Sequence, residues 1–194
     1  MAKNLHIYLF RHGETTYNRD KTFTGLHNPS LTNKGIKQAS IIAKKLKNKQ
    51  FELAFHTKLK RSKQTLNIVL KYHPECKKIK EDNRIIERNY GKLNGTTHES
   101  YIKIYGIEKF NKIHRDFYAR PQKGESFADV EKRVKSFINY LIKLIKKEKI
   151  NVAISAHGNS IRLFRKIMEK ASIKSVCSWK ISYDKIFTYI IKIE

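Results

Sequence analysis

The 194-residue sequence contains only two cysteines and three prolines. Cys76 and Cys177 lie about 100 positions apart, which indicates neither a disulfide framework nor a zinc site. No apolar run approaches the roughly 18 residues that span a bilayer. The first ten residues lack the basic region, long apolar stretch and cleavage site of a signal peptide. These absences predict a cytoplasmic protein without membrane attachment, folded as a single domain over residues 1–194.

Acidic residues are also scarce, with 17 against 42 lysines and arginines, for a formal net charge of +25. Such an excess of positive charge can indicate nucleic-acid binding. Most of these residues are lysines, however, and they run through nearly every expected helix and loop without forming a block. This dispersed pattern is typical of solvated surfaces, so we predict no nucleic-acid partner.

Short apolar runs at residues 5–10, 51–55, 151–156 and 186–193 predict strands. Apolar residues recur at helical spacing after Thr32 or Asn33, over residues 59–70, after Ser126 and after Asn159. Short helices are expected at residues 101–105 and 110–117, and an extended or irregular segment at 79–86. Strands that alternate with helices predict an α/β fold, a three-layer sandwich with a central, mostly parallel sheet flanked by helices.

Two of the expected strands end in a His-Gly pair, His12-Gly13 and His157-Gly158. Ligands of parallel sheets bind beyond the carboxyl ends of the strands, so the two histidines are expected in one cleft. A glycine after each histidine allows the backbone to approach a ligand closely. Asn159 opens a helix, whose free N–H groups favour an anion. Either histidine alone is more readily explained as an ordinary residue at a strand end.

The segment Arg11-His12-Gly13-Glu14-Thr15 matches the signature of the histidine phosphatase superfamily. Within it, nearly the whole chain resembles the short, cofactor-dependent phosphoglycerate mutases. Further matching segments follow in the family's order: Asn18, Phe23-Thr24-Gly25, Leu59-Lys60-Arg61, Glu87-Arg88, Tyr90-Gly91, Gly124-Glu125-Ser126 and Ala156-His157-Gly158-Asn159-Ser160. The resemblance implies the phosphoglycerate mutase fold.

The resemblance also implies a covalent phosphohistidine at His12. This role is chemically coherent, because a neutral imidazole is an adequate nucleophile near pH 7. Arg11, Arg61 and His157 occupy the family's phosphate-pocket positions, where positive charge would neutralise the transferring oxygens. Glu87 occupies its acid/base position. The family is primed by 2,3-bisphosphoglycerate and uses no metal, and the sequence offers no clustered carboxylates to hold one.

Ten further positions match the family's substrate-contacting residues: Asn18, Thr24, Gly25, Arg88, Tyr90, His98, His114, Arg115, Gly158 and Asn159. Two of them depart from the family in type, because His98 replaces a lysine and His114 replaces one arginine of a pair. A histidine in place of a permanent cation weakens carboxylate binding at neutral pH.

Three functions are candidates for this sequence. The first is interconversion of 3-phosphoglycerate and 2-phosphoglycerate in glycolysis and gluconeogenesis, which is an isomerase activity on a small phosphorylated carboxylic acid. The second is a phosphomonoester phosphatase that uses the same His12. The third is a basic binding protein on an inactive fold, against which the intact set of charged site residues argues. Relatives of the mutase type imply a homodimer or homotetramer.

Overall fold

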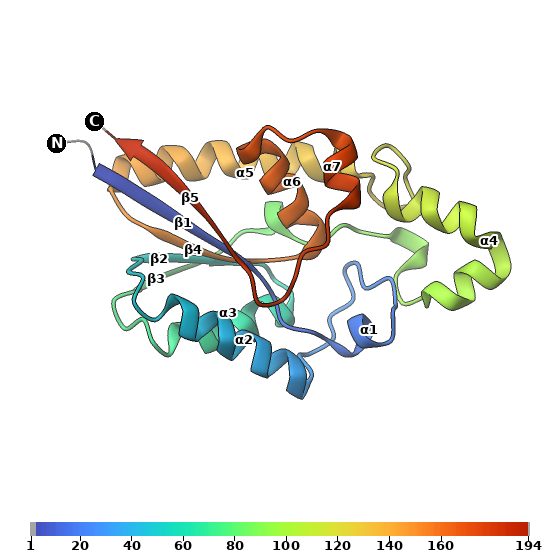
Figure 1. Ribbon diagram of the computed structural model, residues 1–194, viewed down its shortest axis with the longest axis horizontal. Coiled ribbons are helices and arrows are strands. Elements are labelled where there is room, and N and C mark those ends of the chain that lie inside the picture. Colours follow the sequence, from blue (N-terminus) through green and yellow to red (C-terminus); the bar gives the residue numbers. More distant parts are fainter. Residues whose placement is uncertain (1–2, 194) are drawn as a thin grey trace.

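The computed structural model describes residues 3–193 and arranges them as a five-stranded sheet between helical layers (Figure 1). The strands are β1 (Lys3–Arg11), β2 (Leu53–His56), β3 (Lys78–Glu81), β4 (Val152–Ala156) and β5 (Ile186–Ile193). They lie in the order β3-β2-β4-β1-β5, with β5 antiparallel to β1 and the other pairs parallel. The predicted α/β class with a mostly parallel central sheet is confirmed.

Helices α2 (Asn33–Leu46) and α3 (Lys60–Leu70) cover one face of the sheet, and α5 (Phe127–Glu148) and α6 (Gly158–Glu169) cover the other (Figure 1). Alternate residues of β1 serve the two layers. Leu5, Ile7 and Leu9 pack in the cluster that contains α5 and α6, whereas Tyr8 and Phe10 pack against α2 and α3. Each fully buried aliphatic side chain contributes about 1.5–3 kcal/mol, so both layers hold the sheet firmly.

Side chains cap the first turns of two long helices. Thr32 is the cap of α2, and its hydroxyl accepts the Gly35 N–H at 3.0 Å. Ser126 caps α5 by accepting the Asp129 N–H at 3.1 Å, while the Asp129 carboxylate accepts the Ser126 N–H at 2.8 Å. Such reciprocal bonds satisfy donors that the helix itself leaves unpaired.

Helix α4 (His98–Arg115) projects past the end of the sheet (Figure 1). It is broken at Gly106, whose φ of 84° and ψ of 161° are not helical, which accounts for the two short helices expected there. Four shorter elements were not expected, because they are too short for a periodic pattern: α1 (Thr16–Arg19), α7 (Ile173–Ser178) and the 3-10 turns Asn83–Ile85 and Gly91–Leu93. Within residues 3–193, no helix combines the length and hydropathy of a membrane span.

Candidate active site

Two histidines lie side by side where the parallel strands end. His12 follows β1 and His157 follows β4, and the His12 N–H donates to the Ala156 carbonyl at 3.0 Å. The two imidazole rings have centroids 5.0 Å apart and are tilted by 56°. The fold thus brings the two His-Gly segments together, because the carboxyl ends of parallel strands share one edge of the sheet.

The hydrogen bonds of His12 decide which of its nitrogens can react. Nδ1 lies 2.7 Å from the Gly13 carbonyl oxygen, which can only accept, so Nδ1 carries the proton. Nε2 is then unprotonated and accepts the Arg61 Nε–H at 3.2 Å. Burial, and then the charges of Arg61 and Arg11, hold the pKa of His12 well below its usual value. The ring is therefore neutral at pH 7. Its Nε2 lone pair can attack an electrophile that takes the place of the Arg61 N–H.

Gly13 serves the packing of the backbone. A Cβ atom at this position would lie 2.2 Å from the carbonyl oxygen of Gly35, at the start of α2. The sequence analysis expected Gly13 to let the backbone approach a ligand. In the structure, Gly13 lets the backbone after β1 approach the start of α2. The Gly13 N–H also donates to the Thr65 hydroxyl at 3.1 Å, which ties the reactive loop to α3.

Arg61 is fully buried at the start of α3, although its sequence context alone suggests a surface helix residue. Besides His12, its Nη1 donates to the His27 carbonyl at 2.7 Å and its Nη2 to the Gly25 carbonyl at 2.9 Å. Burial lowers the pKa of Arg61 to about 10, so the side chain stays charged at pH 7. Three of its five N–H groups are used, which leaves two for an anion beside His12.

Two further polar atoms belong to the group of side chains around His12. Within residues 3–193, Arg11 Nε and His157 Nδ1 are buried without a hydrogen-bond partner. The Thr57 hydroxyl lies 2.8 Å from His157 Nε2. In the tautomer that accepts a hydrogen bond from this hydroxyl, His157 carries its proton on Nδ1. Buried donors without partners are costly unless a ligand pairs with them. We call Arg11, His12, Arg61 and His157 the phosphate end.

Two serines fasten the halves of the phosphate end together. The Ser62 hydroxyl donates to the Ser155 carbonyl at 2.7 Å, and the Ser155 hydroxyl donates to the Ser62 carbonyl at 2.9 Å. Both residues are fully buried. Ser62 belongs to α3, as Arg61 does, and Ser155 belongs to β4, which leads to His157. The cation and the second histidine are thereby held at a fixed separation.

Glu87 brings a buried carboxylate to the same site. Its Oε1 accepts the Arg88 N–H at 2.7 Å and the Asn159 N–H, in the first turn of α6, at 3.2 Å. Because both bonds go to Oε1, Oε2 is the oxygen that can exchange a proton with a ligand.

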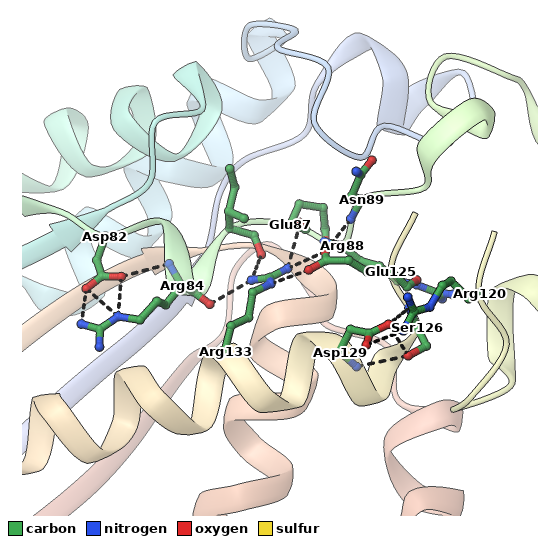
Figure 2. A network of polar contacts seen from close by, with 11 residues as sticks. Asp82, Arg84, Glu87, Arg88, Asn89, Arg120, Glu125, Ser126, Asp129 and Arg133 are labelled. Carbon is green, nitrogen blue, oxygen red and sulfur yellow. Dashed lines mark hydrogen bonds and ion pairs between the residues drawn. The ribbon is translucent and has the colours of Figure 1, made fainter. Parts of the chain in front are cut away.

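Arg133, on α5, anchors the segment that carries Glu87 (Figure 2). Its Nη1 donates to the Arg84 carbonyl at 2.8 Å, and its Nη2 donates to the carbonyl of Glu87 itself at 3.1 Å. The same guanidinium pairs with both oxygens of Glu125 at 2.9 and 3.0 Å. Glu125 in turn accepts the Asn89 N–H at 2.9 Å. The backbone on both sides of Glu87 is therefore fixed to α5.

A cavity of about 230 Å³ opens onto these groups, and Arg11, His12, Arg61 and Glu87 line it. His157 lies beneath this wall, against the His12 ring. Eight of the ten predicted substrate-contacting residues also line the cavity: Asn18, Thr24, Gly25, Tyr90, His98, His114, Gly158 and Asn159.

The family described as histidine phosphatase superfamily (branch 1) matches residues 7–193 of the chain. The chain belongs to this superfamily. A phosphoglycerate mutase of Schizosaccharomyces pombe is 36% identical over 167 residues, which cover 83% of this chain and 77% of that protein. The superfamily membership and this relative agree with the resemblance found in the sequence.

Solved structures share the fold of this histidine phosphatase superfamily member at lower identity. The phosphoglycerate mutase of Bacillus anthracis superposes with a TM-score of 0.82 at 21% identity and covers 99% of this chain and 92% of its own. A putative α-ribazole-5'-P phosphatase from Escherichia coli gives 0.81 at 21% identity and covers 95% and 89%. The same fold therefore occurs in proteins that bear mutase and phosphatase names.

Two arginines that the resemblance assigns to the substrate are not among the residues that line the cavity. Arg88 is fully buried, and its guanidinium donates to the carbonyls of Glu125, Ile113 and Ala119 at 2.7, 3.0 and 2.8 Å. Arg115 donates through Nη1 to the Cys177 carbonyl at 3.0 Å. Both side chains hold the end of α4 and the following loop in place, which is a structural use of their charge.

Aromatic rings form the side of the cavity nearest α4. The Phe23 ring centroid lies 4.8 Å from that of Tyr90 and 4.6 Å from that of His98, and His98 lies 5.3 Å from His114. We call these four residues the distal wall. Burial, and then the charge of Lys21, lower the pKa of His98. Burial is also the main cause that lowers the pKa of His114 to about 3, so the distal wall carries no charge at pH 7.

Residues that the sequence analysis missed also line the cavity, among them Lys21, Arg162 and Tyr183. Arg162 had a usable signal, because it lies three residues after Asn159 and so on the same face of α6. The ring centroid of Tyr183 lies 4.1 Å from the Arg11 guanidinium carbon. No motif marks Tyr183, which reaches the site from the irregular segment before β5.

In the described part of the chain, no three His, Cys, Asp or Glu side chains are grouped so as to hold a metal ion.

Proposed function

We propose that the protein interconverts 3-phosphoglycerate and 2-phosphoglycerate through a phosphohistidine at His12, primed by 2,3-bisphosphoglycerate. The observation that carries the proposal is the neutral, oriented Nε2 of His12 in a cavity shared with Arg11, Arg61 and Glu87. The mutase reaction, rather than another phosphoryl transfer, is supported by the phosphoglycerate mutase relative at 36% identity.

In the proposed reaction, the phosphorylated His12 first meets 3-phosphoglycerate. The 2-hydroxyl of the substrate gives its proton to Glu87 and attacks the phosphorus, so that a P–O bond forms and the P–N bond to Nε2 breaks. The 3-phosphoryl group then moves to Nε2, and its leaving oxygen takes the proton back from Glu87. Arg11 and Arg61 neutralise charge on the transferring oxygens throughout. The product is 2-phosphoglycerate, and His12 is phosphorylated again.

The phosphate end suits the doubly phosphorylated primer, which would supply the first phosphoryl group. Arg11 Nε and His157 Nδ1, buried without partners among the described residues, would donate to its phosphate oxygens, together with the two remaining N–H groups of Arg61.

The test is to incubate the protein with 3-phosphoglycerate, with and without 2,3-bisphosphoglycerate, and to measure 2-phosphoglycerate and free phosphate. Formation of 2-phosphoglycerate that depends on the primer supports the proposal. Free phosphate without isomerisation would overturn it. The His12→Gln variant, purified in parallel, controls for mutase carried over from the expression host. Added chelator is expected to leave the rate unchanged.

A second candidate is a phosphomonoester phosphatase, in which water attacks the phosphohistidine. The observation that favours it is the neutral distal wall, where the resemblance expects a lysine and an arginine at the positions of His98 and His114. Such a wall holds a substrate carboxylate less strongly.

The cytoplasmic location, the single domain and the dimer or tetramer inferred from the sequence stay predictions.

A further inference from the structure

A phosphoglycerate carries a carboxylate as well as a phosphate, and the cavity must offer a cation for it. Arg11 and Arg61 adjoin His12, where the phosphoryl group would be transferred. Arg88 and Arg115 donate to backbone carbonyls and do not line the cavity. His98 and His114 line it but are neutral at pH 7. The cations that line the cavity away from His12 are thus Arg162 and Lys21.

Arg162 is held rigidly but is not saturated with hydrogen bonds. Its Nε and Nη2 donate to the Trp179 carbonyl at 3.0 and 2.7 Å, and its Nη1 donates to Asn159 Oδ1 at 2.9 Å. Three of the five guanidinium N–H groups are used, which leaves one on each of Nη1 and Nη2. Two N–H groups on the terminal nitrogens are the pair that binds the two oxygens of a carboxylate.

The surroundings of Arg162 place it between Glu87 and the distal wall. Asn159, which accepts from Arg162, also donates its backbone N–H to Glu87 and its Nδ2 to the Tyr90 hydroxyl at 3.3 Å. The charge of Arg162 contributes to the lowered pKa of His114. A carboxylate on Arg162 would therefore leave the rest of a short acid to extend past Glu87 toward His12.

We propose that Arg162 binds the carboxylate of the substrate and is the residue that selects phosphorylated short-chain hydroxy acids over other phosphomonoesters. This inference rests on the proposed function. Lys21 is the weaker candidate, because it is exposed and follows α1 in a loop, and its ammonium group is a single point charge on a flexible stem without the paired donors of a guanidinium.

The test compares two ligands of equal length that differ at one end. 3-phosphoglycerate has a carboxylate where glycerol 3-phosphate has an uncharged CH₂OH group. Their dissociation constants are measured by isothermal titration calorimetry on the full-length protein, at pH 7 and low ionic strength. The wild-type protein is expected to bind 3-phosphoglycerate about tenfold to a hundredfold more tightly, the range of a charged hydrogen bond.

The variant Arg162→Gln removes the charge but keeps an amide that can donate to the Trp179 carbonyl. It is expected to lose the preference for 3-phosphoglycerate while its affinity for glycerol 3-phosphate changes little. Arg165→Lys is the matched control, because Arg165 lies on the same helix, stacks on Trp179 at 3.8 Å and does not line the cavity. This control is expected to keep the wild-type preference.

The assignment would be overturned by a wild-type protein without preference, by a preference that survives in Arg162→Gln, or by a preference that disappears in Lys21→Ala instead. A global loss of both affinities in Arg162→Gln would indicate a structural role and would also overturn it. Because the measurement is of binding, a protein that prefers 3-phosphoglycerate but does not isomerise it would refute the proposed function and leave the role of Arg162 intact.

Discussion

The phosphate end and the distal wall are built in different ways, although residues of both line one cavity. The phosphate end comes from the ends of β1 and β4 and the start of α3, and its residues are tied to buried backbone. The distal wall depends on His98 and His114, which come from α4, a helix that projects past the sheet and is broken at Gly106. Its contacts are mostly between rings.

This difference suggests separate tasks for the two regions: phosphoryl transfer at the phosphate end and selection of the substrate near the distal wall. Phosphoryl transfer requires a nucleophile and cations at fixed positions, and the sheet supplies that rigidity. Selection among phosphoesters is expected to depend on the side of the cavity away from His12, where the uncharged distal wall lies together with the cations Arg162 and Lys21. Solved structures with this fold bear both mutase and phosphatase names.

The largest effect is expected at the phosphate end. His12→Gln should reduce phosphoryl transfer from any phosphoester by about 10⁴-fold or more, because the nucleophile is lost. The measurement is labelling of the protein by a radioactive phosphoryl donor, with thermal unfolding as a check that the variant is folded. Labelling that persists on another residue would contradict the assignment of His12.

Glu87→Gln should reduce transfer from alkyl phosphates by about 10²- to 10⁴-fold, the usual range for loss of a general acid or base. p-Nitrophenyl phosphate has a leaving group that needs no proton, so its phosphoryl transfer should change little.

Arg133→Lys should show the same dependence on the leaving group with a smaller loss, about 10- to 100-fold, because it only displaces Glu87. Equal losses for both kinds of donor would rule out a role in proton transfer.

The distal wall should be visible in the pH dependence of stability. The folded protein keeps His114 neutral, with a pKa of about 3, whereas the unfolded chain protonates this residue below about pH 6.5. Acid therefore binds more protons to the unfolded chain, and the free energy of unfolding falls as the pH drops below 6.5. His114→Phe keeps a ring beside Phe110 but removes this contribution.

Between pH 7 and pH 5, the free energy of unfolding of His114→Phe should fall by about 1–2 kcal/mol less than that of the wild-type protein. Urea unfolding at the two pH values measures the difference. Identical pH dependence in the two proteins would mean that His114 titrates alike in the folded and unfolded states, so that the distal wall would gain charge below about pH 6.5.

The smallest effect is expected from Tyr183, whose ring stacks on the Arg11 guanidinium. Tyr183→Leu should raise the KM for phosphate donors by about two- to fivefold, the range of one partly exposed cation–π contact, and leave kcat nearly unchanged. A loss in kcat comparable to that of Glu87→Gln would show that Tyr183 contributes to more than the orientation of Arg11.

Sequence reasoning predicted the sheet and the meeting of His12 with His157, because apolar runs and strand-end motifs are local signals. It placed Arg88 and Arg115 at the substrate by resemblance, whereas both donate to carbonyls from distant segments that no pattern in the sequence reveals. It passed over Arg162 although the helical spacing from Asn159 was readable. Tyr183 reaches the cavity through tertiary packing alone.

The two reciprocal hydrogen bonds between Ser62 and Ser155 order the phosphate end as the chain folds, before a ligand binds. They join α3 to β4 without any contribution from a ligand. The entropy of fixing these two segments is therefore lost once, as the chain folds, and not again with each substrate molecule. A substrate therefore meets a phosphate end whose two segments are already joined.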